Sequence, residues 1–395
     1  MEIKGKYTTA NIFIDELEEE CIKQIKDVVN HPAFTNPIKI MPDAHSGVGC
    51  VIGFTMKMTD KVIPNIIGVD IGCGMLSIRF QTEKEISLSA FDNFIKKHIP
   101  MDMEIHKHER PELFDFNELN KRIAQFIKNY NKTFKKNYKA PQVNYKWLKE
   151  KFKEIDFPEE RFFRSIGTLG GGNHFIELGI TANKNEYLLT FHSGSRHFGN
   201  KVATYWQNVA KKNIKDKSIP GNLAYLTDEL AVNYLVDMVI AQYYAHVNRL
   251  TMWEIVNKHY NFEPKEQIIT IHNYIDFNDF IIRKGAIRSY VGEKVIIPLN
   301  MRDGILICEG KSNPEWNFSA PHGAGRVMSR NKALKTISLE DYKKAMQGIY
   351  STSINKKTID ESPFVYKDHK IIEKAITPTV KILEKIKPIL NIKGF

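Results

Sequence analysis

Short apolar runs of β type, separated by glycine-rich turns, recur from one end of this 395-residue chain to the other. These runs lie at 38–41, 51–54, 76–80, 187–192 and 267–310. Helical segments separate them, so no stretch is long enough to form a module of its own. The pattern predicts one α+β domain spanning the whole chain, with mixed β-sheets interleaved with surrounding helices.

Three helical regions are predicted in the first two thirds of the chain. Apolar residues at helical spacing predict an opening helix over 11–30. Residues 87–155 are charged and lack glycine, which predicts a helical insertion within the domain. Thr227, followed by Asp228, favours the start of a long helix that continues toward His259.

Two further helices are predicted near the C-terminus. Ser338 and Asp341 have the spacing of a capping box at the start of a helix. Residues 371–386 show an amphipathic pattern and are predicted to form a helix that ends before Pro388.

Composition excludes several classes of protein. Hydrophobic residues make up 42% and aromatic residues 11% of the chain, which is too much for a disordered protein. No apolar run approaches the roughly 18 residues that a membrane span needs, and the N-terminus lacks the features of a secretory signal. Four scattered cysteines do not form a disulfide framework. We therefore expect a soluble cytoplasmic protein.

The charge balance is basic, with 57 Lys and Arg against 46 Asp and Glu. Part of this excess lies in 121–139, where Tyr130, Phe134 and Tyr138 alternate with basic residues. This arrangement suits a polyphosphate partner, because bound phosphates release counterions. The alternative is a solvated helix face with its aromatics in the core, and for this segment alone we favour it slightly.

Several metal-ligand side chains share one sequence context. Each lies where an apolar run ends or inside a turn rich in small residues: His45, Asp70, Cys73, His174, His192, His272 and His322. Imidazole, thiolate and carboxylate together suit zinc, manganese or iron. No compact motif closes the site, so the ligands must converge from distant loops. A structural role is the ordinary alternative for any one of these histidines, but their joint occurrence favours a metal centre.

Arginines follow two of these histidines at the same distance. Arg196 lies four residues after His192, and Arg326 lies four residues after His322. Guanidinium groups bind phosphate oxygens, and the neighbouring glycine-rich loops let backbone amides approach a phosphate. Together with the basic surface, these features indicate phosphoryl or nucleotidyl transfer on an anionic polymer.

Five motifs occur in a fixed order along the chain. They are Gly68-Val-Asp-Ile-Gly-Cys-Gly-Met75, Gly170-Gly-Gly-Asn-His-Phe-Ile-Glu177, His192-Ser-Gly-Ser-Arg196, His272-Asn-Tyr274 and His322-Gly-Ala-Gly-Arg326. The order of these motifs and the residues within them closely resemble those of the RtcB family of RNA-splicing ligases. Further matches are Asp43-Ala-His45, Arg283-Lys-Gly-Ala286, Glu361-Ser-Pro-Phe-Val-Tyr-Lys367 and Lys393-Gly394. The resemblance covers 40–394 and implies a single RtcB-like ligase domain.

The resemblance implies a GTP- and manganese-dependent ligase for RNA repair or tRNA splicing. Such an enzyme joins an RNA 3′-phosphate or 2′,3′-cyclic phosphate to a 5′-hydroxyl end. His322 would be the nucleophile, forming a guanylylated histidine that passes GMP to the RNA 3′ end. An archease-type activator is a further partner to consider.

The resemblance also implies roles for individual residues. Cys73 would bridge two Mn²⁺ ions, with His192 and His272 completing one site and Asp70 and His174 the other. The nucleotide would be bound by Asn173, Glu177, Asn300, His322, Gly323, Ala324, Gly325, Tyr366 and Lys393. Phosphate or RNA would be bound by Asp43, His45, Arg196, Arg326 and Arg330.

The chain departs from the family at one wall of the expected nucleotide site. The family usually has Pro-Gly-Ser-Met-Gly where this chain has Pro298-Leu-Asn-Met-Arg-Asp-Gly304. Asn300 thus replaces a serine that touches the nucleotide, which leaves nucleotide preference and the natural RNA open. Two other functions are considered: a metal-dependent phosphodiesterase or nuclease, and a non-catalytic protein that binds RNA ends. The retained His322 loop and the full ligand set disfavour both.

Overall fold

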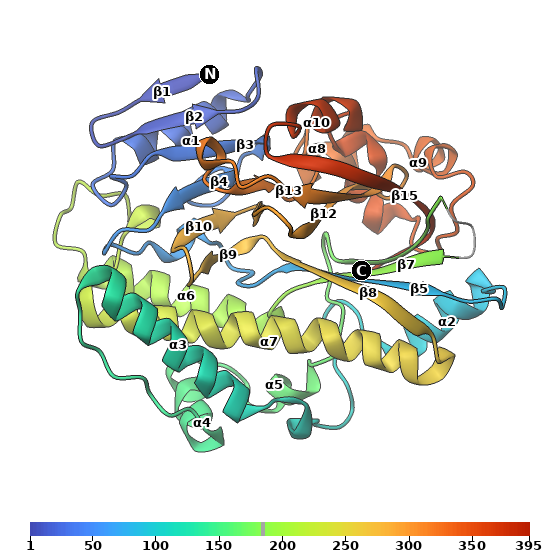
Figure 1. Cartoon of the computed structure of the whole chain (residues 1–395), viewed down its shortest axis with the longest axis horizontal. Coiled ribbons are helices and arrows are strands. Elements are labelled where there is room, and N and C mark those ends of the chain that lie inside the picture. Colours follow the sequence, from blue (N-terminus) through green and yellow to red (C-terminus); the bar gives the residue numbers. More distant parts are fainter. Residues whose placement is uncertain (183–185) are drawn as a thin grey trace.

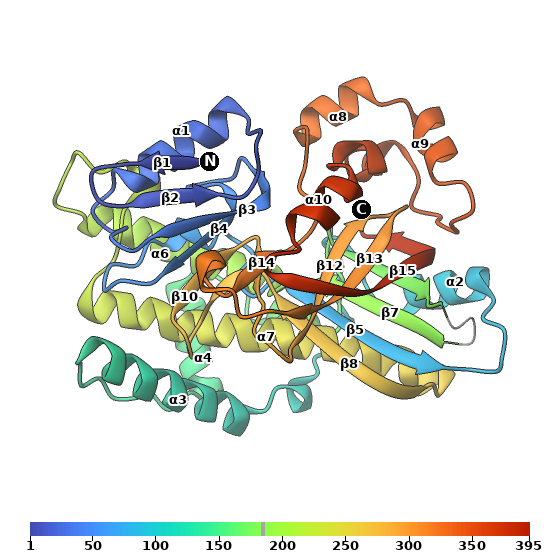
Figure 2. The ribbon, with the colours of Figure 1, turned by 45° about the horizontal axis from the view of Figure 1, so that its top comes forward.

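The computed structural model describes residues 1–182 and 186–395. Its described strands form a six-stranded sheet, a seven-stranded sheet and a two-stranded pair. The two larger sheets lie side by side, and the long helix α7 (Asp228–Tyr260) runs beneath both of them (Figures 1 and 2). The predicted α+β class with mixed sheets is confirmed.

The six-stranded sheet has the order β1-β2-β3-β4-β10-β9. Its strands are β1 Glu2–Lys4, β2 Thr9–Ile12, β3 Ile38–His45, β4 Ile52–Lys57, β10 Ile281–Lys284 and β9 Asn273–Asp276. Only β2 and β3 pair in parallel, and the other neighbours are antiparallel. β3 is buried up to its last residue, which places Asp43 inside the molecule.

The seven-stranded sheet is antiparallel and has the order β12-β13-β15-β6-β7-β5-β8. Its strands are β12 Lys294–Asn300, β13 Gly304–Gly310, β15 Val380–Lys393, β6 Phe175–Ile180, β7 Glu186–Ser193, β5 Gly74–Gln81 and β8 Glu263–Ile271. The short pair of β11 Ala286–Arg288 and β14 Ser319–Pro321 leads directly to His322.

The remaining helices surround the sheets. They are α1 Glu19–Val29, α2 Leu88–His98, α3 Phe116–Phe134, α4 Tyr145–Glu154, α5 Glu160–Arg164, α6 Arg196–Asn213, α8 Arg330–Thr336, α9 Leu339–Ala345 and α10 His369–Ala375. Short 3₁₀ turns lie at Pro64–Ile66, Pro111–Leu113, Gly221–Leu223, Pro314–Trp316, Lys356–Glu361 and Pro363–Val365. In the described part of the chain, no helix has both the length and the apolar character to cross a membrane.

The predicted strands and two of the predicted helix starts are confirmed. α7 begins directly after Thr227, and the Ser338 hydroxyl accepts a 3.0 Å hydrogen bond from the Asp341 amide at the start of α9. The opening helix is only partly correct. Residues 9–12 form β2 instead, and the helix begins at Glu19, because Ala10 and Ile12 are buried between β1 and β3.

The predicted C-terminal helix over 371–386 is correct only for its first residues, which belong to α10, and wrong from 380 onward. Helix α10 ends at Ala375, and β15 begins at Val380. Pro378, which has no amide hydrogen, separates the two elements. β15 hydrogen-bonds to β13 along its first half and to β6 along its second half, so strand pairing extends over its whole length. Tertiary pairing has overridden a local pattern that also fits a helix.

The structural alternative for the basic segment is confirmed. Tyr130 is buried in the main hydrophobic cluster and Phe134 packs against it, while Lys128 and Lys132 are exposed. Residues 87–155 contain helices as their regular elements, apart from turns. That this segment is an insertion stays a prediction.

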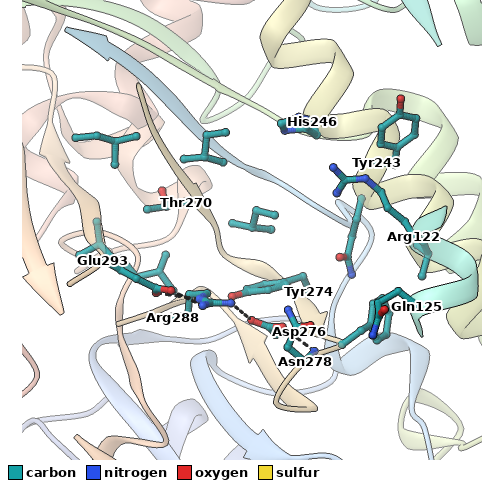
Figure 3. Close-up of a pocket in the computed structure, with 18 of the residues that line it drawn as sticks. Arg122, Gln125, Tyr243, His246, Thr270, Tyr274, Asp276, Asn278, Arg288 and Glu293 are labelled. Carbon is teal, nitrogen blue, oxygen red and sulfur yellow. Dashed lines mark hydrogen bonds and ion pairs between the residues drawn. The ribbon is translucent and has the colours of Figure 1, made fainter. Parts of the chain in front are cut away.

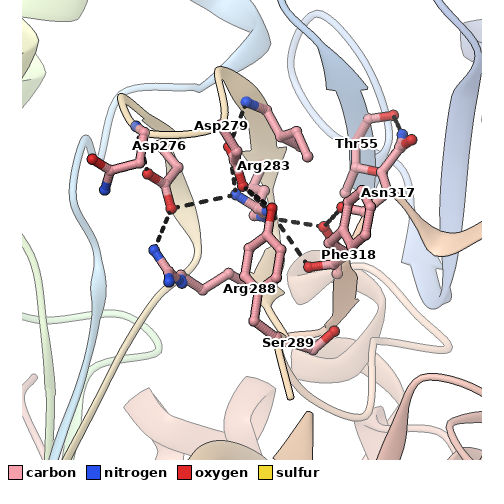
Figure 4. A network of polar contacts seen from close by, with 12 residues as sticks. Thr55, Asp276, Asp279, Arg283, Arg288, Ser289, Asn317 and Phe318 are labelled. Carbon is pink, nitrogen blue, oxygen red and sulfur yellow. Dashed lines mark hydrogen bonds and ion pairs between the residues drawn. The ribbon is translucent and has the colours of Figure 1, made fainter. Parts of the chain in front are cut away.

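A buried arginine ties the hairpin after β8 to the strand that precedes His322 (Figure 4). Arg283 donates from Nε to the Ser319 hydroxyl at 2.9 Å and from Nη2 to Asp279 Oδ2 at 2.9 Å. Arg288 donates to Asp276 in the same network at 2.8 Å. This hairpin, β9 and β10, follows directly after β8 and His272. The network therefore connects the segment after His272 to β14, the strand that precedes His322.

Candidate active site

Five side chains from four separate segments converge into two overlapping groups of metal-ligand atoms. One group is Cys73, His192 and His272, and the other is Asp70, Cys73 and His174, with the ligand atoms in each within 4.8 Å of one another. The Cys73 Sγ lies 3.3 Å from His192 Nε2 and 3.5 Å from His174 Nε2. Cys73 is thus the one member that both groups share.

The seven-stranded sheet explains why these residues meet. The pairing of β5 with both β7 and β8 aligns the start of β5 with the ends of its neighbours, where Cys73, His192 and His272 lie. A tight turn, in which the Cys73 amide donates to the Asp70 carbonyl at 3.2 Å, adds the carboxylate. Gly194 is required beside it, because a Cβ there would lie 2.0 Å from Asp70 Oδ1.

The protonation states of the cluster suit a cation. Burial and the neighbouring His272 lower the pKa of His192, and burial and His322 lower that of His272. Neutral imidazoles have a lone pair for a metal. Burial and Asp70 raise the pKa of Cys73, and a bound divalent cation reverses this effect by stabilising the thiolate. The residues present therefore fit a metal cofactor with nitrogen, sulfur and oxygen ligands.

Sequence reasoning missed a buried arginine beneath the cluster. Arg249 on α7 donates from Nη1 to the carbonyls of Gly72 at 2.9 Å and Ser193 at 2.7 Å. Arg249 therefore holds the backbone next to Cys73 and the backbone next to His192. Burial lowers its pKa to about 10, although Cys73 and Asp70 raise it. Arg249 lies within the long helix α7 and outside every motif, so the sequence gave no local signal for it.

His322 lies next to this cluster and is oriented by a buried carboxylate. Its ring centroid is 4.8 Å from that of His272. Its Nδ1 is 2.6 Å from Asp43 Oδ2, and its backbone amide donates to the same oxygen at 3.2 Å. A carboxylate can only accept, so the ring proton lies on Nδ1 and the Nε2 lone pair stays available.

The backbone around Asp43 is fixed by two contacts. Lys367 Nζ donates to the carbonyls of Pro42 and Ala44, both at 2.9 Å. Gly325 has a φ of +75°, and a Cβ there would lie 2.2 Å from the Asp43 carbonyl oxygen. A side chain at position 325 would therefore push the His322 loop away from its partner.

A cavity of about 680 Å³ opens over His322, His192 and His272. Most of the residues predicted to bind nucleotide or phosphate line it: His45, Asn173, Glu177, Asn300, Gly323, Ala324, Gly325, Arg326, Arg330, Tyr366 and Lys393. The cavity thus brings together the imidazole of His322, histidines of the metal-ligand groups and basic side chains.

Comparison with known proteins agrees with this arrangement. The family model described as tRNA-splicing ligase RtcB matches residues 24–394. The chain belongs to the RtcB family. It is 30% identical over 403 residues to the RNA-splicing ligase RtcB of Escherichia coli K12, covering 96% of this chain and 95% of that protein. It is 26% identical to the tRNA-splicing ligase RtcB of Nanoarchaeum equitans, with 100% and 96% covered.

Membership of the RtcB family makes the protein an RNA ligase. The matched range contains every residue predicted to bind metal, nucleotide or phosphate. The cluster around Cys73 provides the donor atoms for a metal cofactor, and RNA is the substrate expected of this family.

Glu361 joins four of the RtcB-type cavity residues, and sequence reasoning did not assign it a role. Its Oε2 accepts from Tyr366 at 2.7 Å and from Lys393 at 2.8 Å, and its Oε1 lies 2.8 Å from Arg330. Arg326 is 3.4 Å from the same Oε1. Although burial opposes ionisation, Lys393 and Arg330 lower the pKa of Glu361, so a fixed anion holds the cationic wall in place.

Asn300, where this chain differs from the usual family sequence, lies in a turn that its own side chain stabilises. Asn300 Oδ1 accepts from the amides of Arg302 and Asp303, both at 2.9 Å, and its Nδ2 donates to Asp303 Oδ2 at 2.7 Å. The side chain that replaces the usual serine is thus engaged with its own turn, although it lines the cavity.

Two of the predicted phosphate or RNA ligands, Arg196 and the fully buried Asp43, are not among the residues that line the cavity. Arg196 lies beside His174 and outside the set of cavity-lining residues, with Nε donating to the Thr168 hydroxyl at 2.8 Å and Nη2 to the Asp102 carbonyl at 2.6 Å. His45 lines the cavity, and burial lowers its pKa to about 4, so it is neutral at physiological pH.

A second cavity of about 960 Å³ lies between α3, α7 and the edge of β8 (Figure 3). Tyr243 and His246 of α7 and Arg122 of α3 line it, opposite Thr270. None of the residues predicted to bind metal, nucleotide or phosphate lines this cavity.

Proposed function

We propose that this protein joins RNA 3′-phosphate or 2′,3′-cyclic phosphate ends to 5′-hydroxyl ends at the expense of GTP. One observation carries the proposal: His322, oriented by Asp43, faces the same cavity as the histidines of the metal-ligand cluster. An Asp–His pair can also act as a general base for water, and membership of the RtcB family favours the nucleophilic role of His322 over hydrolysis.

In the first step, His322 Nε2 attacks the α-phosphorus of GTP. A nitrogen–phosphorus bond forms, the bond to the β-phosphate oxygen breaks, and pyrophosphate leaves. Asp43 keeps the proton on Nδ1 and stabilises the positive charge that the ring gains, which is how a carboxylate assists a nucleophilic imidazole.

In the second step, an oxygen of the RNA 3′-phosphate attacks the phosphorus of the guanylylated histidine. The nitrogen–phosphorus bond breaks and the imidazole leaves, giving RNA capped by GMP at its 3′ end. The RNA 5′-hydroxyl then attacks the 3′-phosphate, GMP leaves, and a 3′,5′-phosphodiester forms. A 2′,3′-cyclic phosphate is first opened to a 3′-phosphate by water.

Two Mn²⁺ ions would be held by Cys73 together with His192 and His272, and by Cys73 together with Asp70 and His174. When bound, such ions neutralise charge on phosphate oxygens. Near them, Arg326 and Arg330 provide guanidinium groups for phosphates, and Asn173 lies on the exposed turn before His174.

The nucleotide base would occupy the wall formed by Glu177, Tyr366 and Lys393. Glu177 is 2% exposed and Lys393 is 4% exposed, so contacts made there are shielded from water. An archease-type activator and a cytoplasmic location stay predictions.

The test is a strand-joining assay with Mn²⁺ and GTP. One RNA pair carries a 3′-phosphate and a 5′-hydroxyl, and the matched pair carries a 3′-hydroxyl and a 5′-phosphate. We expect joined product only from the first pair, only with GTP, and none with His322→Ala. Shortened RNA that forms without GTP would instead indicate a metal-dependent phosphodiesterase.

A further inference from the structure

Two buried side chains face each other across the paired strands β6 and β15. Asn391 and Glu177 are register partners, and both line the cavity over His322. Asn391 is 1% exposed and donates from Nδ2 to Glu177 Oε2 at 2.7 Å. No role was predicted for Asn391 from the sequence.

This hydrogen bond determines what the pair offers to a ligand. The Asn391 NH₂ group is the donor to Glu177 Oε2, which leaves the Asn391 Oδ1 free. Burial favours the protonated form of Glu177 in the free protein, and a ligand that donates to Oε1 stabilises the ionised form instead. Within the described residues, Asn391 Oδ1 and Glu177 Oε1 are both buried and have no hydrogen-bond partner. Buried acceptors without donors are costly, so this pair fits a ligand that carries two neighbouring donors.

Among the purines, guanine has such an edge. Its N1–H and its 2-amino group are adjacent donors, whereas adenine has an acceptor at N1 and no 2-amino group. The neighbouring Lys393 provides a complementary donor for the guanine O6, since its ammonium has three hydrogens and contacts two acceptors, Glu361 and the Asn173 carbonyl. This side of the cavity therefore offers two acceptors, on Asn391 and Glu177, and one donor, on Lys393.

We propose that Asn391 is a specificity-determining residue whose Oδ1 accepts a hydrogen bond from the purine 2-amino group, beside a Glu177 that binds N1–H. This inference rests on the proposed use of GTP. It separates two tasks: Glu177 discriminates against adenine, and Asn391 discriminates against hypoxanthine, which differs from guanine only by lacking the 2-amino group.

The test compares GTP with ITP. Formation of the covalent nucleotide adduct is measured at limiting nucleotide, and kcat/KM is obtained for wild type, Asn391→Leu and the control Asn213→Leu. Asn213 lies at the exposed end of α6, outside the cavity. We expect wild type and control to prefer GTP about 10-fold or more, as one buried hydrogen bond allows. In Asn391→Leu, the kcat/KM for GTP should fall to the value for ITP.

The opposing result is equally clear. If Asn391 only orients Glu177, the use of both nucleotides falls by the same factor in Asn391→Leu and the preference for GTP is retained. Equal use of GTP and ITP by wild type would also overturn the proposal, whether or not the variant folds.

Equilibrium binding of both nucleotides to His322→Ala separates this inference from the proposed function. A GTP preference in binding that Asn391→Leu removes supports the role of Asn391 even if no covalent adduct ever forms. No preference in binding overturns that role even if ligation is observed.

Discussion

Replacing Asp43 with asparagine tests how His322 is activated. Asp43 is fully buried, and its Oδ2 is 2.6 Å from His322 Nδ1, so the variant keeps the volume but loses the charge. A hydrogen bond to a charged partner contributes about 1.5–3 kcal/mol. At 1.36 kcal/mol per tenfold change in rate, this predicts that nucleotide transfer to His322 slows by about 10- to 150-fold.

The assay is the single-turnover rate of covalent labelling by GTP carrying a labelled α-phosphate. Asp27→Asn makes the same chemical change at an exposed position on α1 and should label at the wild-type rate. Metal content should be unchanged in both variants, because Asp43 is outside the metal-ligand groups. A wild-type labelling rate in Asp43→Asn would refute the idea that Asp43 activates the histidine.

Three other predictions concern the metal, the scaffold and pH. Cys73→Ala removes the ligand that both groups share, so bound manganese measured by mass spectrometry should fall at both sites, while Cys308→Ala should retain it; full metal content in Cys73→Ala would contradict the assignment. Arg249→Met leaves two carbonyls without donors, at about 1–3 kcal/mol each, and should lower the melting temperature clearly. An unchanged melting temperature would show that Arg249 does not brace the cluster. Burial raises the pKa of Glu177 from 4.5 to about 8, so the folded state holds a proton that the unfolded chain loses, and stability falls as pH rises from about 5 to 8. The free energy of unfolding in urea, compared between pH 6 and pH 8.5, should fall more for wild type than for Glu177→Gln. Equal decreases in the two proteins would contradict this.

The strands that carry the site were predictable because glycine-rich turns bound short apolar runs there. The two ends of the chain were harder. Residues 371–386 have a spacing that fits one helix face, and their membership of a strand depends on pairing with β13 and β6, whose partners lie far away in the sequence. Similarly, Thr9–Ile12 is a strand because β1 and β3 lie on either side of it.

The candidate site was predictable where residue type itself signals chemistry. Histidines and a cysteine at strand ends indicated a metal centre, and the structure brings Asp70, Cys73, His174, His192 and His272 together. Residues that act through other residues gave no such signal. Arg249, Glu361 and Asn391 are ordinary side chains in sequence, and their roles follow only from the groups that they contact in the fold.

The most direct test of the account is the covalent adduct itself. The protein is incubated with Mn²⁺ and GTP carrying a labelled α-phosphate, and the modified residue is located by peptide mass spectrometry. We predict one GMP on His322, which His322→Ala abolishes while its metal content remains at the wild-type level. A metal-loaded protein that forms no adduct, or one that carries GMP on another residue, would contradict the central claim.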